Sequence, residues 1–536
     1  GEVVRVHFIE KILASVLAKL SNFIPEGGIW MNTQRPEWND ANNALVGNGV
    51  SMVTLFYLRR FIRYLRELVA ASSLDNVLVS DEVAGFYDRV SKALQENEGL
   101  LKGKITGEAR KRMMDLLGEA ASAFRKQIYA QGFSGDSRAV SLAGLASFSE
   151  TALSFLDHSI RANHRADRLF HAYHVVTIEE NAARVAPLSE MLEGQVAALS
   201  SGYLSPEESL QVLDALRASA LYRADQNSYL LYPNKDLPGF LKKNTISEDL
   251  LKSTLLYPKL SEGAYGAVLE KDLHGNYHFN GNFKNANDLE AALDLHGAYS
   301  PAERNALLNL FEDVFHHKAF TGRSGTFFGY EGLGSIYWHM VSKLRLAVLE
   351  TCQRAIEQGT EEGITSQLLA HYFSIVEGIG VHKSPALYGA FPTDPYSHTP
   401  LGKGAQQPGM TGQVKEDILC RFGELGIAAD DGKLHFHPVM LRRSEFSLAS
   451  RVVQYAGVAG DLQSLSLEAG ALFFTYCQTP VIYALAEKEA LEITYADGHT
   501  QRSPVLMVNE ADSRKIWRRT GEIRQVKVWL SPDRLL

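Results

Sequence analysis

Cysteine is scarce in this sequence. The chain has 3 cysteines, Cys352, Cys420 and Cys477, which are widely spaced and odd in number. This pattern argues against a disulfide framework and matches no zinc-ligand spacing. We therefore expect a cytoplasmic protein that binds no metal.

Long apolar runs are also missing. The most apolar late stretch, residues 471–486, is interrupted by Gln478 and Pro480 and is too short and polar to cross a bilayer. We predict no transmembrane segment and no membrane partner. The first twenty residues have apolar positions at helical spacing but no small-residue cleavage site, so no signal peptide is evident.

The sequence also lacks an excess of positive charge. Its formal net charge is -8, with 22% charged and 45% hydrophobic residues. A polyanionic nucleic acid is therefore not expected as a partner, and a neutral ligand fits better. At 536 residues and 59.3 kDa, the chain is long enough for several structural units or for one large toroid with appendages.

Helical periodicity dominates from residue 50 to about residue 221. Four segments have apolar residues three and four positions apart: 52–70, 79–94, 107–129 and 142–160. Helices of this length with short links favour hairpins in an α-toroid, because no fixed-period repeat supports the alternative of an α-solenoid. Two further helices are predicted over 301–315 and 336–359.

Two other regions differ in character. Residues 222–293 are turn-rich, which predicts a long loop-rich excursion that acts as a lid or binding loop, with a structural excursion as the alternative. From residue 434 onward, short patterns with a period of two predict an antiparallel β unit. We therefore predict a helical region over 1–424, containing the excursion, and a β-rich cap over 425–536.

The richest motif is the segment 34–43, which reads Gln-Arg-Pro-Glu-Trp-Asn-Asp-Ala-Asn-Asn. A carboxyl group with a raised pKa can protonate a departing glycosidic oxygen, and Glu37 and Asp40 are both available. The Trp38 face can stack on a sugar ring, and amides such as Asn39 can bind its hydroxyls. A polar helix-capping loop is the alternative interpretation.

A second polar cluster extends from residue 320 to residue 339. Its glycines would let backbone amides approach a ligand, while Arg323 and His339 are suited to an anion or to sugar hydroxyls. A tight turn leading into the next helix is the alternative.

A third cluster, between residues 381 and 413, is rich in imidazoles, amides and hydroxyls. Thr411 and Gly412 directly precede the helical pattern of 414–422. Their amides would lie at a helix N-terminus, where unpaired N–H groups and the helix dipole favour a phosphate. The alternative is an N-capping threonine with a solvated loop and structural histidines before it.

These features together resemble a known family. The Trp38-Asn39-Asp40 motif, the helical body, the Thr411-Gly412 helix start and the strand segment 431–438 resemble inverting carbohydrate phosphorylases. The relatives are cellobiose phosphorylase in glycoside hydrolase family 94 and the β-1,3-glucan phosphorylases of families 149 and 161. The resemblance implies a mainly α fold, with an (α/α)6-toroid catalytic body and a small C-terminal antiparallel β domain.

The resemblance also has implications for the extent of the chain. Family members carry a β-sandwich and the first barrel helices ahead of the aspartate, whereas 39 residues precede Asp40 here. We expect the chain to be the C-terminal portion of a longer polypeptide, with a partner that supplies the missing part as the alternative. A homodimer is implied by the resemblance alone.

The resemblance assigns roles to individual residues. It makes Asp40 the general acid and gives Thr411 and Gly412 to phosphate. The family also uses a histidine and a glutamine at the phosphate, for which the candidates are His339, His382 or His398 and Gln406 or Gln407. The candidate substrate-binding residues are Arg35, Glu37, Trp38, Asn39, Arg323, Glu331 and Tyr396.

The expected activity is reversible phosphorolysis of a β-glucosidic bond, most simply a β-1,3 bond, in a gluco-oligosaccharide. Inorganic phosphate is the co-substrate, the product is α-glucose 1-phosphate, and no cofactor is needed. One alternative is an inverting β-glucan hydrolase, in which Glu331 or Glu377 would activate water. The other is a carbohydrate-binding toroid without catalysis, which predicts that the three polar clusters lie far apart.

Overall fold

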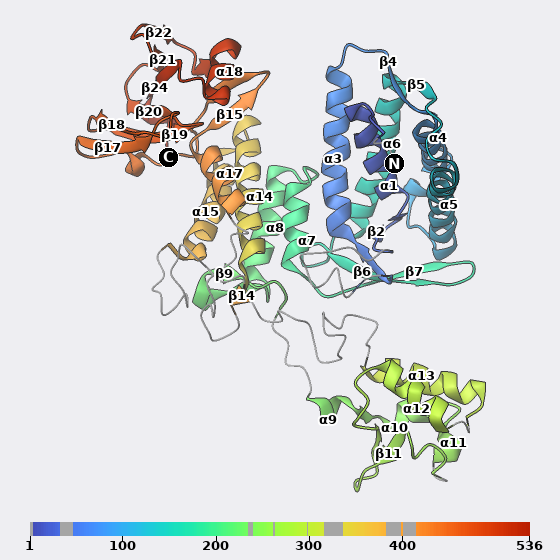
Figure 1. Ribbon diagram of the computed structural model, residues 1–536. Helices are drawn as coiled ribbons and strands as arrows, with labels where there is room; N and C mark the ends of the chain where they lie inside the picture. Colours follow the sequence, from blue (N-terminus) through green and yellow to red (C-terminus); the bar gives the residue numbers. More distant parts are fainter. Residues whose placement is uncertain are drawn as a thin grey trace. The chain divides into compact units, whose positions relative to one another are not determined.

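The structure is a computed structural model that describes residues 4–32, 45, 47–233, 239–260, 263–296, 299–315, 336–381, 398–399 and 414–536. The chain is mainly α-helical and includes a β-rich domain (Figure 1). It divides into two compact units, residues 1–410 and residues 411–536. Within the described residues, no helix is both long enough and apolar enough to span a membrane.

Unit 1 begins with helices that pack beside an antiparallel sheet of order β1-β2-β3-β6-β7. The strands are β1 (Phe23–Ile24), β2 (Gly28–Trp30), β3 (Gly49–Ser51), β6 (Tyr173–Ile178) and β7 (Ala183–Pro187). The helices are α1 (Phe8–Leu20), α3 (Met52–Ala71), α4 (Asp81–Gln95), α5 (Gly107–Gln131) and α6 (Leu142–Ala162), with the short turn η1 (Glu98–Lys102). The four helices predicted over 52–160 are confirmed to within two residues at each end.

Side-chain caps explain where α3, α5 and α6 begin. The hydroxyl of Ser51 accepts a hydrogen bond from the Thr54 N–H at 3.0 Å, and the Ser141 hydroxyl caps α6 in the same way. Each cap satisfies an N–H group that has no partner within its helix. Strand β4 (Asn76–Ser80) connects α3 to α4 and pairs antiparallel with β5 (Ser137–Ser141), which leads into α6.

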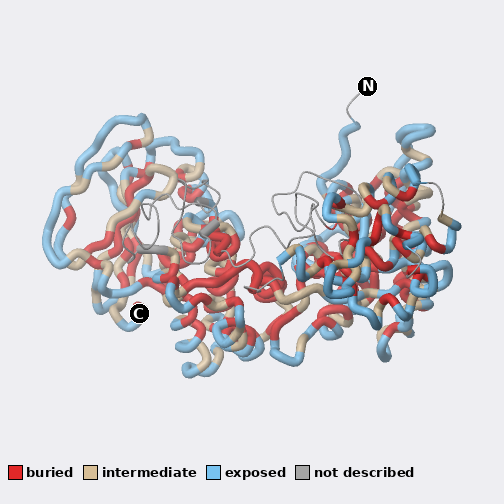
Figure 2. Tube along the Cα trace, turned by 90° about the horizontal axis from the view of Figure 1, so that it is seen from below, coloured by how far each residue is buried: buried red, intermediate tan, exposed pale blue. Residues whose placement is uncertain are grey.

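A second group of helices extends the first. Its members are α7 (Leu192–Ser200), α8 (Pro206–Ala218), α14 (Trp338–Glu357) and α15 (Glu362–Val376). Helix α7 packs against α3 and α14, and α14 packs against α15, so the layer is continuous from α3 to α15. Buried residues run through the interior of the helical region, where the tube is red (Figure 2). Trp338 is fully buried. The arrangement fits paired helices, while the complete (α/α)6 toroid stays a prediction.

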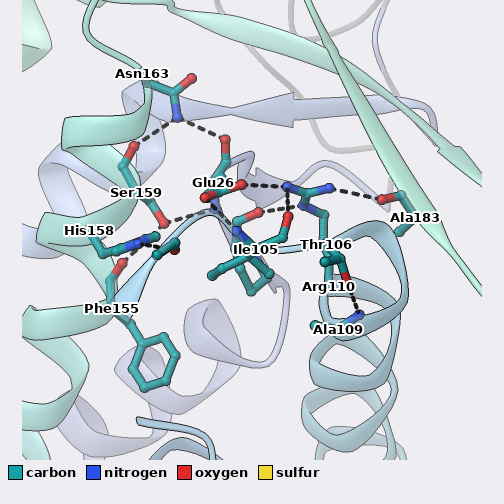
Figure 3. Close-up of polar contacts among 12 residues, drawn as sticks. Glu26, Ile105, Thr106, Ala109, Arg110, Phe155, His158, Ser159, Asn163 and Ala183 are labelled. Atoms are coloured by element: carbon teal, nitrogen blue, oxygen red, sulfur yellow. Dashed lines mark hydrogen bonds and ion pairs between the residues drawn. The ribbon is translucent and has the colours of Figure 1, made fainter. Parts of the chain in front are cut away.

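A buried ion pair joins the sheet to α5 (Figure 3). The guanidinium of Arg110, in the first turn of α5, donates to the Glu26 carboxylate at 2.7 Å. It also donates to the backbone carbonyls of Pro25 and Ala183, at 2.8 and 3.1 Å. The two side chains are only 10% and 9% exposed, so water screens the pair little.

The backbone of Glu26 is held as firmly as its side chain. Glu26 follows Pro25 in the β1–β2 turn and has a φ of 58°, a left-handed conformation that costs a non-glycine residue energy. Its N–H donates to the Ser159 hydroxyl at 3.0 Å, and its carbonyl accepts from the Asn163 amide at 2.8 Å. Both partners lie in or directly after α6, so the turn is fixed from two helices.

Residues 239–315 form a small module with its own core. Its described helices are α9 (Phe240–Lys243), α10 (Glu248–Lys252), α11 (Tyr257–Leu260), α12 (Ala286–His296) and α13 (Pro301–Phe315). Its antiparallel sheet contains β10 (Thr245–Ile246), β12 (Tyr277–Phe279) and β11 (Leu269–Lys271), in that order. The rings of Phe279 and Phe311 meet edge to face, with centroids 5.0 Å apart, in an apolar cluster confined to the module.

This module corrects one prediction and confirms another. The loop-rich character predicted over 222–293 is wrong for its described residues, because short helices and strands pack there around aromatic side chains. The helix predicted over 301–315 is confirmed. Whether the module acts as a lid over a site stays a prediction.

Unit 2 is the β-rich domain, and its described part opens with α17 (Val414–Glu424). The remaining elements are β15 (Ile427–Asp430), β16 (Lys433–Phe436), β17 (Arg451–Ala456), β18 (Leu462–Leu467), β19 (Ala471–Tyr476), β20 (Thr479–Leu485), β21 (Ala490–Tyr495), β22 (Thr500–Ser503), β23 (Met507–Val508), α18 (Glu510–Arg518) and β24 (Ile523–Leu530). The main sheet has the order β19-β20-β24-β21-β22. Because β20 and β24 are parallel, the predicted purely antiparallel domain is wrong in this respect.

The buried ion pair generates a prediction about stability. We expect Arg110→Met to lower the free energy of unfolding by about 3–5 kcal/mol, because the Glu26 carboxylate would remain buried without its partner. Urea unfolding measures the loss. The control is Arg184→Met, which removes the exposed pair with Glu179 and should cost at most about 1 kcal/mol. Equal losses in the two variants would contradict the role assigned to the buried pair.

A second prediction concerns the acid stability of the module. Hydrogen bonds from Lys259 and then from Ser300 lower the pKa of Glu303 from 4.5 to about 2. The hydrogen bonds of the ionised Glu303 carboxylate therefore stabilise the module fully above pH 4.5. This stabilisation is lost as the pH falls toward 2 and the carboxylate is protonated. We therefore expect Glu303→Gln to reduce the pH dependence of amide hydrogen exchange in 239–315 over this window. The exposed Glu290→Gln control should leave it unchanged.

Candidate active site

The segment that contains Asp40 leaves and rejoins the fold at one end of the β2–β3 pair. Met31, which follows β2, donates its N–H to the Gly49 carbonyl at 2.9 Å and accepts from the Gly47 N–H at 2.7 Å. The indole N–H of Trp30 also donates to the Gly47 carbonyl, at 3.0 Å. The segment 33–44, which contains Asp40 and is called the acid segment below, lies outside the described residues. Its two flanks are fastened to each other by these hydrogen bonds.

A cavity of about 400 Å³ lies beside this junction. Its wall includes Trp30 and Asn32 from the upstream flank and Asn22 from the end of α1, and the Asn32 amide donates to the Asn22 side-chain oxygen at 2.6 Å. The opposite wall comes from α5 and includes the Lys111–Asp115 pair, whose atoms are 2.7 Å apart. An aromatic ring, amides and charged groups in one cavity suit a hydroxylated ligand.

A second junction pairs the backbone just before His339 with the backbone of His398. Strand β13 (Ile336–Tyr337) pairs with β14 (His398–Thr399), with Tyr337 opposite His398. His339 lies two residues further on, in the first turn of α14. The second and third polar clusters therefore meet in the backbone, which is evidence against clusters that all lie far apart.

The His339 ring is oriented by its neighbour. Its Nδ1 lies 3.0 Å from the hydroxyl of Tyr337, and the two rings meet edge to face with centroids 5.1 Å apart. Because the first turn of a helix presents N–H groups and the positive end of the dipole, this position suits an anion. Tyr337 lies two positions before His339 and pairs with His398 in the sheet, and both histidines were predicted as phosphate ligands. The role of Tyr337 was not predicted, because the sequence does not reveal which side chain it orients.

Of the two carboxylates considered as the base of a hydrolase, Glu377 lies among the described residues of unit 1. Glu377 is exposed and begins the π-helical turn η3 (Glu377–Val381), which directly follows α15. Gly378 in this turn packs so closely on the backbone of Asn227 that an added Cβ would lie 2.0 Å from the Asn227 carbonyl oxygen. The Asn227 amide also donates to the Ser374 carbonyl at 3.3 Å, so the turn is fastened to the loop before β9 (Ser228–Tyr229).

Most of the predicted site residues lie outside the described residues. These are Arg35, Glu37, Trp38, Asn39, Asp40, Arg323, Glu331, His382, Tyr396, Gln406, Gln407, Thr411 and Gly412. His339 is described with its side chain, and His398 by its backbone. Among the described residues, no group of three or more His, Cys, Asp or Glu side chains is placed to hold a metal, and the absence of a metal stays a prediction.

Residues 237–318 match the family described as GH149 phosphorylase insertion domain 2. The matched range encloses the separately packed module of 239–315. The module begins after β9 and ends before β13, and these two strands contact each other, so the chain leaves and re-enters the helical body at one place. This is the geometry of an inserted domain. A comparison with curated proteins gave no match.

This match supports a relationship to phosphorylases of the family 94 type, and it indicates a glycoside phosphorylase of carbohydrate metabolism. It bears on the module directly, because the matched residues cover that part of the chain alone. The Trp38-Asn39-Asp40 and Thr411-Gly412 motifs lie outside the matched range, and their roles stay predictions.

Proposed function

We propose that this chain carries the acid and phosphate-binding elements of an inverting phosphorylase, which cleaves a β-1,3-glucosidic bond in gluco-oligosaccharides. The observation that carries this proposal is the match of 237–318 to an insertion domain of family 149 phosphorylases. It is supported by the Trp38-Asn39-Asp40 motif, whose flanks are fastened to each other by the bonds between Met31, Gly47 and Gly49. The linkage follows from the resemblance to families 149 and 161.

In the proposed reaction, Asp40 acts as general acid. Its carboxyl proton passes to the glycosidic oxygen as the bond from that oxygen to the anomeric carbon breaks. An oxygen of inorganic phosphate bonds to the same carbon from the opposite face, through an oxocarbenium-like transition state. The products are α-glucose 1-phosphate and the shortened oligosaccharide, and solvent returns a proton to Asp40.

We assign the phosphate to the junction of β13, β14 and the start of α14. His339 is held there by Tyr337, and His398 enters the same junction opposite Tyr337. The N-terminal dipole of the 20-residue helix α14 adds to the attraction for an anion. Thr411 and Gly412, the other phosphate candidates, lie outside the described residues, and their role stays a prediction.

We assign sugar binding to the cavity beside Trp30 and Asn32. Both residues directly precede the acid segment, so a sugar in this cavity would lie next to the flank that leads to Asp40. The Trp30 ring offers an apolar face to a pyranose, and Asn22 and Asn32 offer amides to its hydroxyls. Neither Trp30 nor Asn32 was predicted, although their proximity to Trp38-Asn39-Asp40 in the sequence is a usable signal.

The role of Asp40 can be tested by substitution. Asp40→Asn should lower kcat for phosphorolysis of laminari-oligosaccharides by at least about 10²-fold, because the amide cannot donate the required proton. Release of glucose 1-phosphate is measured with and without inorganic phosphate, alongside cello-oligosaccharides to identify the linkage. Substantial activity in Asp40→Asn would contradict the assignment. Release of reducing sugar without phosphate would favour a hydrolase, with Glu331 or Glu377 as the base.

The phosphate junction is tested separately. His339→Asn preserves a polar atom near the Nδ1 position that meets Tyr337 and removes the distal side of the imidazole. We expect the KM for phosphate to rise about 10-fold, because a hydrogen bond to a charged group is lost, with a smaller change in the KM for oligosaccharide. His7→Asn, at an exposed position of the same residue type, is the control. A rise in the oligosaccharide KM alone would place His339 at the sugar instead.

A further inference from the structure

Asn22 is the residue at which the end of α1 meets the upstream flank of the acid segment. It lies two positions after Leu20, the last residue of α1, and it lines the cavity beside Trp30 and Asn32. Its backbone carbonyl accepts a hydrogen bond from the Trp30 N–H at 2.8 Å, and its side-chain oxygen accepts from the Asn32 amide at 2.6 Å. Asn22 is therefore bonded to both flank residues that we assign to the sugar.

The orientation of the Asn22 amide follows from its contact with α1. Its side-chain nitrogen donates to the carbonyl oxygen of Ala18 at 2.8 Å. Ala18 belongs to the last turn of α1, where the carbonyls have no partner within the helix. A backbone carbonyl only accepts hydrogen bonds, so the nitrogen of the Asn22 amide has to face Ala18. The oxygen of the same amide then faces Asn32.

The same reasoning fixes the Asn32 amide. Because the side-chain oxygen of Asn22 only accepts, Asn32 has to present its nitrogen to it. One N–H of Asn32 is used in this bond, which leaves its carbonyl oxygen and its second N–H for a ligand. Asn32 is exposed and lines the cavity, so a ligand in the cavity can reach its side chain.

A fixed amide binds a sugar more strongly than a free one. An exposed asparagine side chain without such a bond has several rotamers, and a ligand that immobilises it loses part of its binding free energy. The bond to Asn22 restricts Asn32 before the ligand arrives, and it also determines which end of the amide serves as the acceptor. This preorganisation strengthens binding without requiring Asn22 to touch the sugar.

We propose that Asn22 is a positioning residue for Asn32. It holds the Asn32 amide so that its carbonyl oxygen accepts a hydrogen bond from a hydroxyl of a gluco-oligosaccharide. The inference rests on the proposed function, because that function places the sugar in this cavity.

The test is calorimetric titration of the whole chain with laminaritriose in the absence of phosphate, so that binding is measured without turnover. Asn22→Ala should raise the Kd about 5-fold, because Asn32 loses the hydrogen bond that orients it. The matched control is Asn97→Ala. The Asn97 amide donates to the Ala93 carbonyl at the end of α4, also at 2.8 Å, and Asn97 does not line the cavity. This control should lower the Tm by a similar amount and leave the Kd unchanged.

A second variant, Asn22→Asp, separates binding from stability. Its carboxylate still accepts from Asn32, but it cannot donate to the Ala18 carbonyl, and its negative charge lies at the C-terminal end of the α1 dipole. We therefore expect a lower Tm together with a Kd within about 2-fold of that of the unmodified chain. A Kd as high as that of Asn22→Ala would attribute the effect to the helix end and overturn the proposal.

A double-mutant cycle with Asn32→Ala tests whether the two side chains act together. We expect the rise in Kd of the double variant to be smaller than the product of the two single rises. Four other outcomes would overturn the proposal: single rises that multiply, an unchanged Kd in Asn22→Ala, an equal rise in Asn97→Ala, or no binding of laminaritriose. Release of glucose 1-phosphate is measured separately. Laminaritriose binding without phosphorolysis would contradict the proposed function and leave the role of Asn22 intact.

Discussion

The Glu26–Arg110 pair is the interaction on which the arrangement of the first sheet depends. It fixes the β1–β2 turn to the start of α5, while Ser159 and Asn163 fix the same turn to the end of α6. Strand β2 runs from this turn directly to Trp30 and Met31, where the acid segment begins. The flanks of the acid segment lie about one strand length from this turn, so the buried charge pair sets their position. Such a pair tolerates little displacement.

The same turn separates two chemical environments. One end of the hairpin carries the cavity with Trp30 and amides, next to the acid segment, and the other carries a second cavity, whose lining includes three histidines. Glu26 neutralises Arg110 at the second cavity, and its left-handed backbone lets its N–H, carbonyl and carboxylate reach different partners at once. The strain of that conformation is offset by hydrogen bonds that a glycine would make only in part.

The long helices of unit 1 could be predicted because their apolar residues repeat every three or four positions over more than four turns. Strands β1, β2 and β3 have two or three residues each, too few for any period to be visible. Most of the module escaped prediction because its described helices and strands before residue 286 have two to five residues each, again too few for a period to be visible. The parallel β20–β24 pair also escaped, because strand patterns reveal alternation but not direction. For the candidate site, the sequence motifs predicted which residue types take part. They could not predict that Tyr337 lies opposite His398, because that pairing joins segments about 60 residues apart in the sequence.

The insertion point of the module connects these observations to the proposed chemistry. Strand β9 precedes the module in the sequence, and β13, which contains Tyr337, follows it and leads directly into α14, which carries His339. Because β9 and β13 contact each other, the module can be inserted or altered without moving the start of α14. A phosphate site built on β13 and α14 would therefore keep its geometry while the inserted domain varies, which is the separation expected of a conserved reaction with a variable glycan specificity.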